Sequence, residues 1–300
     1  MPGFDPFLDF VGVAAPRSGT TWIAAALREH PEIWMPAAKE LNFFNEPSLN
    51  HLEFKYPRGL DYYREQFSGA PRDDLVSGEF SPTYYVDPNT ASRIAKHFPD
   101  ARILVYLRNP VDVVYSTYLK TLEYGLGEKS FELALERTPS LVELGHYYQG
   151  LRPYFELFPR EQIFVQIFET LFDSPGAACK SVYRFLGVDP SFRPRVLHRK
   201  VNPRGTVRSR GLVAVQHHAR HLMNRPTLLP LKRMLNRNGA LDRMREGLIR
   251  LNRKKADLPE LDPDMRQRLE ERYSADIDKL EGLLGQSLDV WRKGQKPAAS

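Results

Sequence analysis

The chain has 300 residues, of which 42% are hydrophobic, and it carries 43 Lys and Arg against 37 Asp and Glu. These values are typical of a globular protein with a sizeable core. No run of about 18 apolar residues is present, which argues against a transmembrane helix, and a lone cysteine, Cys179, excludes an internal disulfide framework. The first nine residues lack the basic start of a signal peptide. We therefore expect a soluble, cytoplasmic protein.

The net charge of +6 is unevenly distributed. Residues 193–255 hold 18 Lys and Arg but only two acidic residues, a net charge of +16, whereas the rest of the chain carries −10. Such a basic block predicts an anionic partner, which could be a phosphate, a nucleic acid, a membrane surface or a sulfated ligand. Arg outnumbers Lys 30 to 13, which favours forked recognition of oxyanions.

Short apolar runs alternate with longer amphipathic stretches over the first two thirds of the chain. The pattern predicts strands over residues 10–14, 75–80, 103–107 and 163–168, and helices over 21–30, 91–98, 110 to about 124, 146–158 and 175–186. Pro31, Pro99 and Gly187 are typical of helix ends. Alternating strands and helices indicate an α/β fold with a largely parallel central sheet flanked by helices.

The last third of the chain has a different pattern. Residues 211–257 are basic and mostly helical in pattern, and residues 258–263 resemble a linker. Asp262 and Pro263 then open a helix over 262–285, in which apolar residues recur at helical spacing: Met265, Leu269, Tyr273, Ile277, Leu280 and Leu284. We expect one domain over 1–300, with a core at about 9–210 and both C-terminal additions packed on it.

The segment over residues 10–22 carries the strongest chemical signal. A buried strand runs into a turn with Arg17, Ser18 and Gly19, and Thr20 and Thr21 open the next helix. Free amides at a helix start bind anions, and the hydroxyls and the guanidinium add donors. The motif is not the phosphate loop of nucleotide hydrolases, because Thr20 rather than Lys follows the glycine.

Residues 16–22, Pro-Arg-Ser-Gly-Thr-Thr-Trp, resemble the 5′-phosphosulfate loop of sulfotransferases that use 3′-phosphoadenosine-5′-phosphosulfate (PAPS). The usual form has Lys at the place of Arg17, and bacterial members commonly carry Arg. The resemblance implies a P-loop-like fold and PAPS as co-substrate. It also implies that the donor is bound by this loop: Arg17, Ser18, Gly19, Thr20, Thr21 and Trp22.

The following segments resemble the heparan-type branch of the same family. His30-Pro31 and the Lys-Glu-x-x-Phe-Phe pattern at 39–44 match its elements, which implies that Glu40 is the general base and that Lys39 shields charge or pairs with Glu40. Residues 59–63 and 79–85 match two further segments. Phe80 stands where polysaccharide sulfotransferases have a catalytic lysine, which removes a cation from the expected site.

A second anion motif lies at 104–116, where a strand ends at Arg108, and Ser116 follows about two helical turns into the next helix. It resembles the family's 3′-phosphate motif, so Arg108 and Ser116 are expected to bind that phosphate. The loop at 199–209 resembles the one that closes over the adenosine phosphate, with Arg204 and Gly205 as candidates and Arg208 as the alternative.

The remaining candidates favour structural roles. Cys179 lies in a helical stretch and is expected to be a small buried filler rather than a nucleophile. His217 and His221 have metal-ligand spacing but sit among basic residues, so we expect no metal. Phe168 could stack on a ligand or pack in the core, and His146 is a second candidate base. Residues 227–255 could contact an anionic membrane, whereas nucleic acid is the weakest partner.

The sequence as a whole predicts a PAPS-dependent sulfotransferase that transfers a sulfuryl group to an acceptor hydroxyl on a glycan, glycolipid, polyketide or other lipid, or small molecule. Two alternatives stay open. One is a P-loop kinase, against which the missing lysine counts. The other is a non-catalytic basic protein that binds membranes or anions.

Overall fold

The structure is a computed structural model, and it describes residues 7–46, 53–72, 74–123, 128, 130–198, 206–207, 253–254 and 260–292. The strands of the main sheet are β1 (Phe10–Ala14), β2 (Ile33–Trp34), β3 (Val76–Phe80), β4 (Arg102–Leu107) and β5 (Ile163–Ile167). The helices are α1 (Thr20–Glu29), α2 (Gly59–Glu65), α3 (Thr90–His97), α4 (Pro110–Glu123), α5 (Phe131–Arg137), α6 (Pro139–Glu143), α7 (Tyr147–Leu157), α8 (Phe168–Leu171), α9 (Pro175–Leu186), α13 (Pro263–Leu284) and α14 (Asp289–Arg292).

The predicted parallel sheet is confirmed. Its strands run in the order β2-β3-β1-β4-β5, and every neighbouring pair is parallel. From β1 the chain builds β2 and β3 on one side and then crosses to β4 and β5 on the other. The carboxyl ends of the strands therefore meet at one edge, next to the switch in strand order, where open α/β sheets bind ligands.

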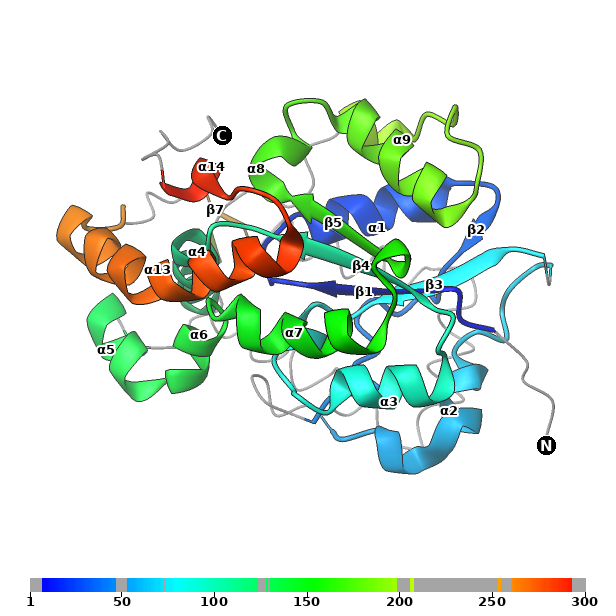
Figure 1. Cartoon of the computed structure of the whole chain (residues 1–300), viewed down its shortest axis with the longest axis horizontal. Helices are drawn as coiled ribbons and strands as arrows, with labels where there is room; N and C mark the ends of the chain where they lie inside the picture. Colours follow the sequence, from blue (N-terminus) through cyan, green and yellow to red (C-terminus); the bar gives the residue numbers. More distant parts are fainter. Residues whose placement is uncertain are drawn as a thin grey trace. The chain divides into compact units, whose positions relative to one another are not determined.

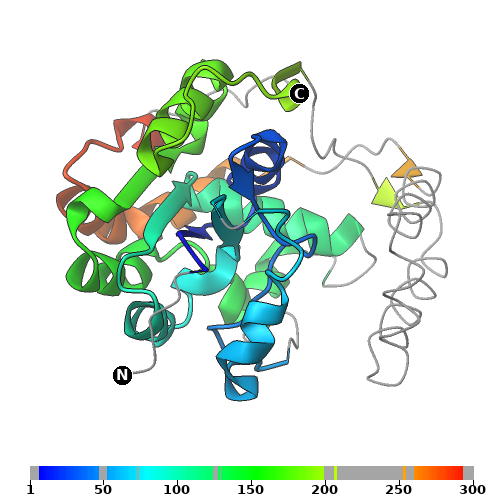
Figure 2. The ribbon, with the colours of Figure 1, turned by 90° about the vertical axis from the view of Figure 1, so that its right-hand side faces the viewer.

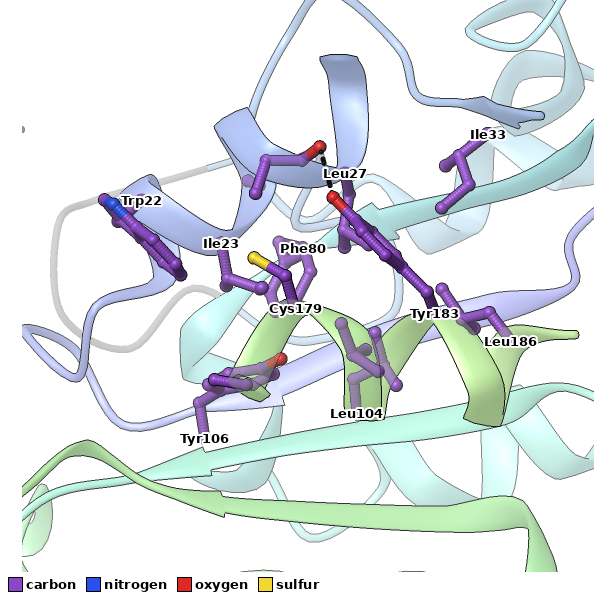
Figure 3. Close-up of a cluster of buried hydrophobic side chains, with 14 of the residues drawn as sticks. Trp22, Ile23, Leu27, Ile33, Phe80, Leu104, Tyr106, Cys179, Tyr183 and Leu186 are labelled. Atoms are coloured by element: carbon purple, nitrogen blue, oxygen red, sulfur yellow. Dashed lines mark hydrogen bonds between the residues drawn. The ribbon is translucent and has the colours of Figure 1, made fainter. Parts of the chain in front are cut away.

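Helices cover both faces of this sheet (Figure 1), with α1 and α9 on one face and α3 and α7 on the other. Figure 2 shows α1 and the α2–α3 region on opposite sides of the strands. The α1 face buries a cluster of side chains from α1, α9 and the central strands (Figure 3), including Trp22, Leu27, Tyr106 and Cys179. The Tyr183 hydroxyl donates to the carbonyl oxygen of Ala26 (3.1 Å), which joins α9 to α1.

Cys179 is a buried filler, as predicted, because only 1% of it is exposed. Burial raises the pKa of its thiol to about 11, so the reactive thiolate is scarce at neutral pH.

One predicted strand needs correction at its end, and several short elements were not predicted. The strand predicted over 163–168 ends at Ile167, because Phe168 begins the short helix α8. The two-residue strand β2 was missed, since it is too short to show an alternating pattern. Helices α2, α5 and α6, of five to seven residues, were also not predicted.

The C-terminal helix is confirmed in detail. Asp262 accepts a hydrogen bond from the Met265 amide (3.0 Å), Gly285 ends α13 in the left-handed region, and all six predicted apolar residues are buried. The Tyr273 hydroxyl donates to the carbonyl oxygen of Val142 (2.9 Å), and the Asp276 carboxylate accepts from the first amide of α7, that of Tyr147 (2.8 Å). Helix α13 thus packs on α6 and α7, within the same compact unit.

The chain divides into two compact units: residues 1–117, 135–201 and 261–300 form one, and residues 118–134 and 202–260 the other. In the second unit, β6 (Thr206–Val207) pairs antiparallel with β7 (Arg253–Lys254). The prediction of a mostly helical segment is wrong for Arg253–Lys254, which form strand β7. All other residues of 211–257 lie outside the described residues. The expectation of one domain over 1–300 stays a prediction. No helix of the described residues is both long and apolar enough to cross a membrane.

Gly12, in the central strand, is required by its neighbour. A Cβ atom there would lie 2.0 Å from the Phe80 ring, which packs directly over the glycine backbone. We expect Gly12→Ala to lower the free energy of unfolding by about 1–3 kcal/mol through overpacking, as measured by urea denaturation. Gly282→Ala is the matched control, because Gly282 lies in α13 with open space around it, and it should be stabilising by about 0.5–1 kcal/mol. An undiminished stability of the Gly12 variant would mean that the Phe80 ring moves freely.

Candidate active site at the carboxyl edge of the sheet

The loop after β1 adopts a compact left-handed turn. Arg17 has a φ of +65° and Gly19 a φ of +81°. The Ser18 side chain is fully buried and its hydroxyl donates to the carbonyl oxygen of Ala15 (2.5 Å). Ser18 was predicted to bind PAPS. Because its hydroxyl proton is used in the hydrogen bond to Ala15, only its backbone amide could donate to such a ligand.

Gly19 caps α1 with its backbone alone. Its carbonyl oxygen accepts from the amides of Trp22 (2.9 Å) and Ile23 (3.1 Å), and no described side chain caps this helix start. A Cβ atom at Gly19 would lie 2.9 Å from Leu171 and 3.3 Å from Phe168, both in α8. The tight approach of α8 therefore requires glycine here, in addition to the backbone conformation.

The residues that follow Gly19 differ in what they can offer a ligand. Thr20 is buried and Thr21 is half-buried in the first turn of α1. Trp22 is 4% exposed, its indole N–H donates to the carbonyl oxygen of Val196 (3.2 Å), and its ring packs against Phe172. Trp22 was a predicted donor-binding residue, and in the structure its side chain anchors α1.

The two predicted anion motifs meet. Arg17 Nε donates to Ser116 Oγ (3.1 Å), and Arg108 Nη1 donates to the carbonyl oxygen of Arg17 (3.2 Å). The Arg108 guanidinium lies 4.6 Å from the centre of the Phe168 ring, so the ring of Phe168 packs against this cation. Two guanidinium groups, a hydroxyl and the start of α1 are thereby gathered at one place.

Further residues hold Arg108 and the start of α4. The Tyr147 hydroxyl donates to the carbonyl oxygen of Arg108 (2.8 Å). The Glu169 carboxylate accepts from the Asn109 amide and from the Trp291 indole N–H, each at 2.9 Å. Burial raises the pKa of Glu169, and these two hydrogen bonds oppose the rise. Glu169 and Trp291 were not assigned this role from the sequence, where 122 residues separate them.

The predicted base lies at the end of the neighbouring strand. The Glu40 amide donates to the carbonyl oxygen of Phe80 (3.0 Å), and the Ser81 amide donates to that of Gly12 (3.1 Å), so the turn at 40 lies beside β1 and β3. Lys39 Nζ lies 2.9 Å from Glu40 Oε1. The Glu40 side chain is 49% exposed, which leaves its carboxylate accessible to a substrate.

Phe80 itself lies in the core. It is 1% exposed and packs edge-on against Phe10 and Tyr106, on the α1 side of the sheet. Its ring fills the core on this side of the sheet.

The other candidates lie elsewhere or outside the described residues. His146 precedes α7, where its Nδ1 is 3.8 Å from Asp276 and its ring packs against Tyr273 of α13. Arg204, Gly205, Arg208, His217 and His221 lie outside the described residues. In the part of the chain that the structure describes, no three His, Cys, Asp or Glu side chains are grouped so as to hold a metal ion.

Gly19→Ala is expected to lower the free energy of unfolding by about 1–3 kcal/mol, since it combines a left-handed backbone with a clash against α8. Gly187→Ala is the matched control, because Gly187 has a φ of +77° but its nearest neighbour would lie 4.0 Å away. Chemical denaturation should give a loss about 1 kcal/mol larger at Gly19. Equal losses would contradict the tight contact with α8.

Relatives with about 29% identity carry sulfotransferase names. The human protein "Heparan sulfate glucosamine 3-O-sulfotransferase 6" is 29% identical over 197 residues, which cover 62% of this chain and 54% of that protein. The human "Bifunctional heparan sulfate N-deacetylase/N-sulfotransferase 2" is 29% identical over 203 residues, which cover 60% of this chain and 22% of that protein. The chain thus spans about half, or less, of the length of these relatives.

A solved sulfotransferase from Alicyclobacillus acidocaldarius has the same fold, with a TM-score of 0.69 and 24% identity over 95% of this chain and 99% of that one. The family profile described as "Sulfotransferase domain" matches residues 8–204, about two thirds of the chain. This match includes the loop after β1, the turn at Glu40 and the Arg108–Ser116 motif, and it shows that the chain belongs to the sulfotransferase domain family.

Proposed function

We propose that the protein transfers a sulfuryl group from PAPS to the hydroxyl group of an acceptor. The single observation that carries the proposal is the junction of the two anion motifs: Arg17 Nε to Ser116 Oγ at 3.1 Å, and Arg108 Nη1 to the Arg17 carbonyl at 3.2 Å. PAPS carries two separate anionic groups, and this junction offers donors for both. Membership of the sulfotransferase domain family supports the same reading.

The donor set fits the chemistry of PAPS. Arg108 and Ser116 are proposed to bind the 3′-phosphate, and the turn from Arg17 to Thr21, with the start of α1, is proposed to bind the 5′-phosphosulfate. Arg17 contacts Ser116, so it can couple the two groups. Trp22 holds the start of α1 in place through its hydrogen bond to the Val196 carbonyl oxygen. Arg204 and Gly205, which lie outside the described residues, are also proposed to contact PAPS.

The proposed reaction is an in-line transfer. The acceptor oxygen attacks sulfur, the bond from sulfur to the bridging phosphate oxygen breaks, and 3′-phosphoadenosine-5′-phosphate (PAP) leaves. Glu40 takes the proton of the acceptor hydroxyl. Arg17 and the amides of the turn stabilise the negative charge that develops on the bridging oxygen. Lys39, which pairs with Glu40, shields the negative charge of the sulfuryl donor. The proposed reaction requires no metal ion.

The acceptor is proposed as a class. The name of one relative, a heparan sulfate glucosamine 3-O-sulfotransferase, points to a glycan hydroxyl, so this acceptor comes first in the panel to be tested. Glycolipids, polyketides or other lipids, and small phenols complete it. Contact of residues 227–255 with a membrane surface, and a cytoplasmic location, stay predictions.

The kinase alternative has less support. A P-loop kinase uses a lysine directly after the last glycine of its loop, and Thr20 stands there. The family match likewise favours sulfuryl transfer over a non-catalytic anion-binding protein.

Arg108→Ala and Ser116→Ala should weaken the binding of PAP, because each removes a donor to a charged phosphate. We expect dissociation constants about 10-fold to 100-fold higher for Arg108→Ala, and a smaller rise for Ser116→Ala, by titration calorimetry. Arg152→Ala is the control, since Arg152 pairs with Glu156 on the exposed face of α7. Absence of PAP binding by the unaltered protein, with tight binding of ATP and magnesium instead, would select the kinase.

Glu40→Gln should lower turnover by about 10²-fold to 10⁴-fold while the KM for PAPS changes little, because the amide cannot accept the acceptor's proton. Release of labelled PAP across the acceptor panel measures both parameters. Glu156→Gln, an exposed carboxylate on α7, serves as control. Unchanged turnover in the Glu40 variant would exclude it as the base.

A further inference from the structure

Four successive backbone amides in the turn that carries Glu40 are bound by the last two residues of β3 and by two residues that follow it. The Glu40 amide donates to the carbonyl oxygen of Phe80 (3.0 Å), and the Leu41 amide donates to Glu79 Oε2 (3.3 Å). The next two amides donate to hydroxyls: that of Asn42 to Ser81 Oγ (2.9 Å) and that of Phe43 to Tyr84 Oη (3.0 Å). Three of these four amides are bound by side-chain oxygens, and only the Glu40 amide is bound by a backbone carbonyl.

The Glu79 carboxylate takes part in three of these four contacts, one directly and two through hydroxyl groups. Glu79 is 2% exposed and binds the Leu41 amide directly. It also accepts from the Ser81 hydroxyl (2.7 Å) and the Tyr84 hydroxyl (2.6 Å), the same hydroxyls that receive the Asn42 and Phe43 amides. Because each hydroxyl has one proton, donation to Glu79 leaves its lone pairs free for the amide.

The turn needs this support because its backbone is strained. Glu40 has a φ of +67°, in the left-handed region that most non-glycine residues avoid, and Asn42 has a φ of +46°, which asparagine adopts more readily. The conformation at Glu40 costs about 1–3 kcal/mol and persists only where its surroundings fix it. The contacts of Glu79, Ser81 and Tyr84 hold the amides of residues 41–43, directly after Glu40.

The cluster surrounds the Glu79 carboxylate with hydrogen-bond donors. Tyr63 Oη also donates to Glu79 (2.9 Å), so all four partners of this side chain are donors. Burial raises the pKa of Glu79, and the four hydrogen bonds act in the opposite direction. Glutamine at this position would have one oxygen in place of two and would add N–H donors that face other donors.

We propose that Glu79 is a positioning residue for the general base: through Ser81, Tyr84 and the Leu41 amide, it fixes the turn that aims Glu40 at the acceptor hydroxyl. This inference rests on the proposed function, since it assigns Glu40 the role of base. Glu79 does not touch either substrate. It acts through the backbone of residues 40–43.

The test compares variants of the full chain. Glu79→Gln removes the acceptor at the centre of the cluster, and Tyr84→Phe removes only the hydroxyl between Glu79 and the Phe43 amide. Both should lower kcat about 10-fold to 100-fold, because a base displaced by about 1 Å loses that much. The KM for PAPS and the dissociation constant for PAP should stay within about threefold, since the donor site is built from other residues.

Tyr85→Phe is the matched control. Tyr85 is the next residue, equally buried, but its hydroxyl donates to the carbonyl oxygen of Leu144 (2.7 Å), away from the turn. It should cost similar stability and leave kcat within about threefold. In parallel, hydrogen exchange of the amides over 40–44 should accelerate about 10-fold or more in Glu79→Gln, while amides over 17–23 keep their protection.

The outcomes separate the two claims. If the unaltered protein neither binds PAP nor consumes PAPS with any panel acceptor, the proposed function fails. If the unaltered protein is active and Glu79→Gln matches its kcat, or if Tyr85→Phe loses as much kcat as Tyr84→Phe, the inference about Glu79 alone is overturned. Unchanged exchange over 40–44 would also overturn it, whatever the reaction.

Discussion

The hydrogen bond between Arg17 and Ser116 joins the loop after β1 to helix α4, across 99 residues of the chain. It is possible only because β1 and β4 are parallel neighbours, so that both strands end at the same edge. Register fixes the result further, since Ala14 pairs with Tyr106 and each anion motif begins within a few residues of that pair. The candidate site therefore follows from the pairing of two buried strands.

Two carboxylates, the buried Glu79 and the partly buried Glu169, hold the site on either side of this junction. Glu79 binds the turn next to β3, and Glu169 binds the start of α4 next to β5. Both accept hydrogen bonds from backbone amides and from aromatic side chains. Removing a carboxylate from water is unfavourable, and the hydrogen bonds that each one accepts offset this cost. The same hydrogen bonds fix a backbone segment next to the candidate site.

Much of this arrangement could be predicted from the sequence. Strand ends followed by Arg17 and Arg108 predict convergence at one edge, because parallel strands align their carboxyl ends. The helical spacing in α13 likewise predicts its buried face. Three features resisted prediction for physical reasons. Strand β2 has only two residues, Glu79 looks like any polar residue in a strand, and the partnership of Glu169 with Trp291 depends on tertiary packing of α14.

The contact between Gly12 and Phe80 has a consequence for how this chain can change. The aromatic ring occupies the volume that a side chain at position 12 would fill, so the two residues share one space in neighbouring strands. A lysine at position 80 would leave that space partly empty and bring an ammonium group next to Phe10 and Tyr106, whose rings pack against Phe80. A residue larger than glycine at position 12 therefore requires a smaller one at position 80, and a cation at position 80 requires a different packing of the layer between α1 and the sheet.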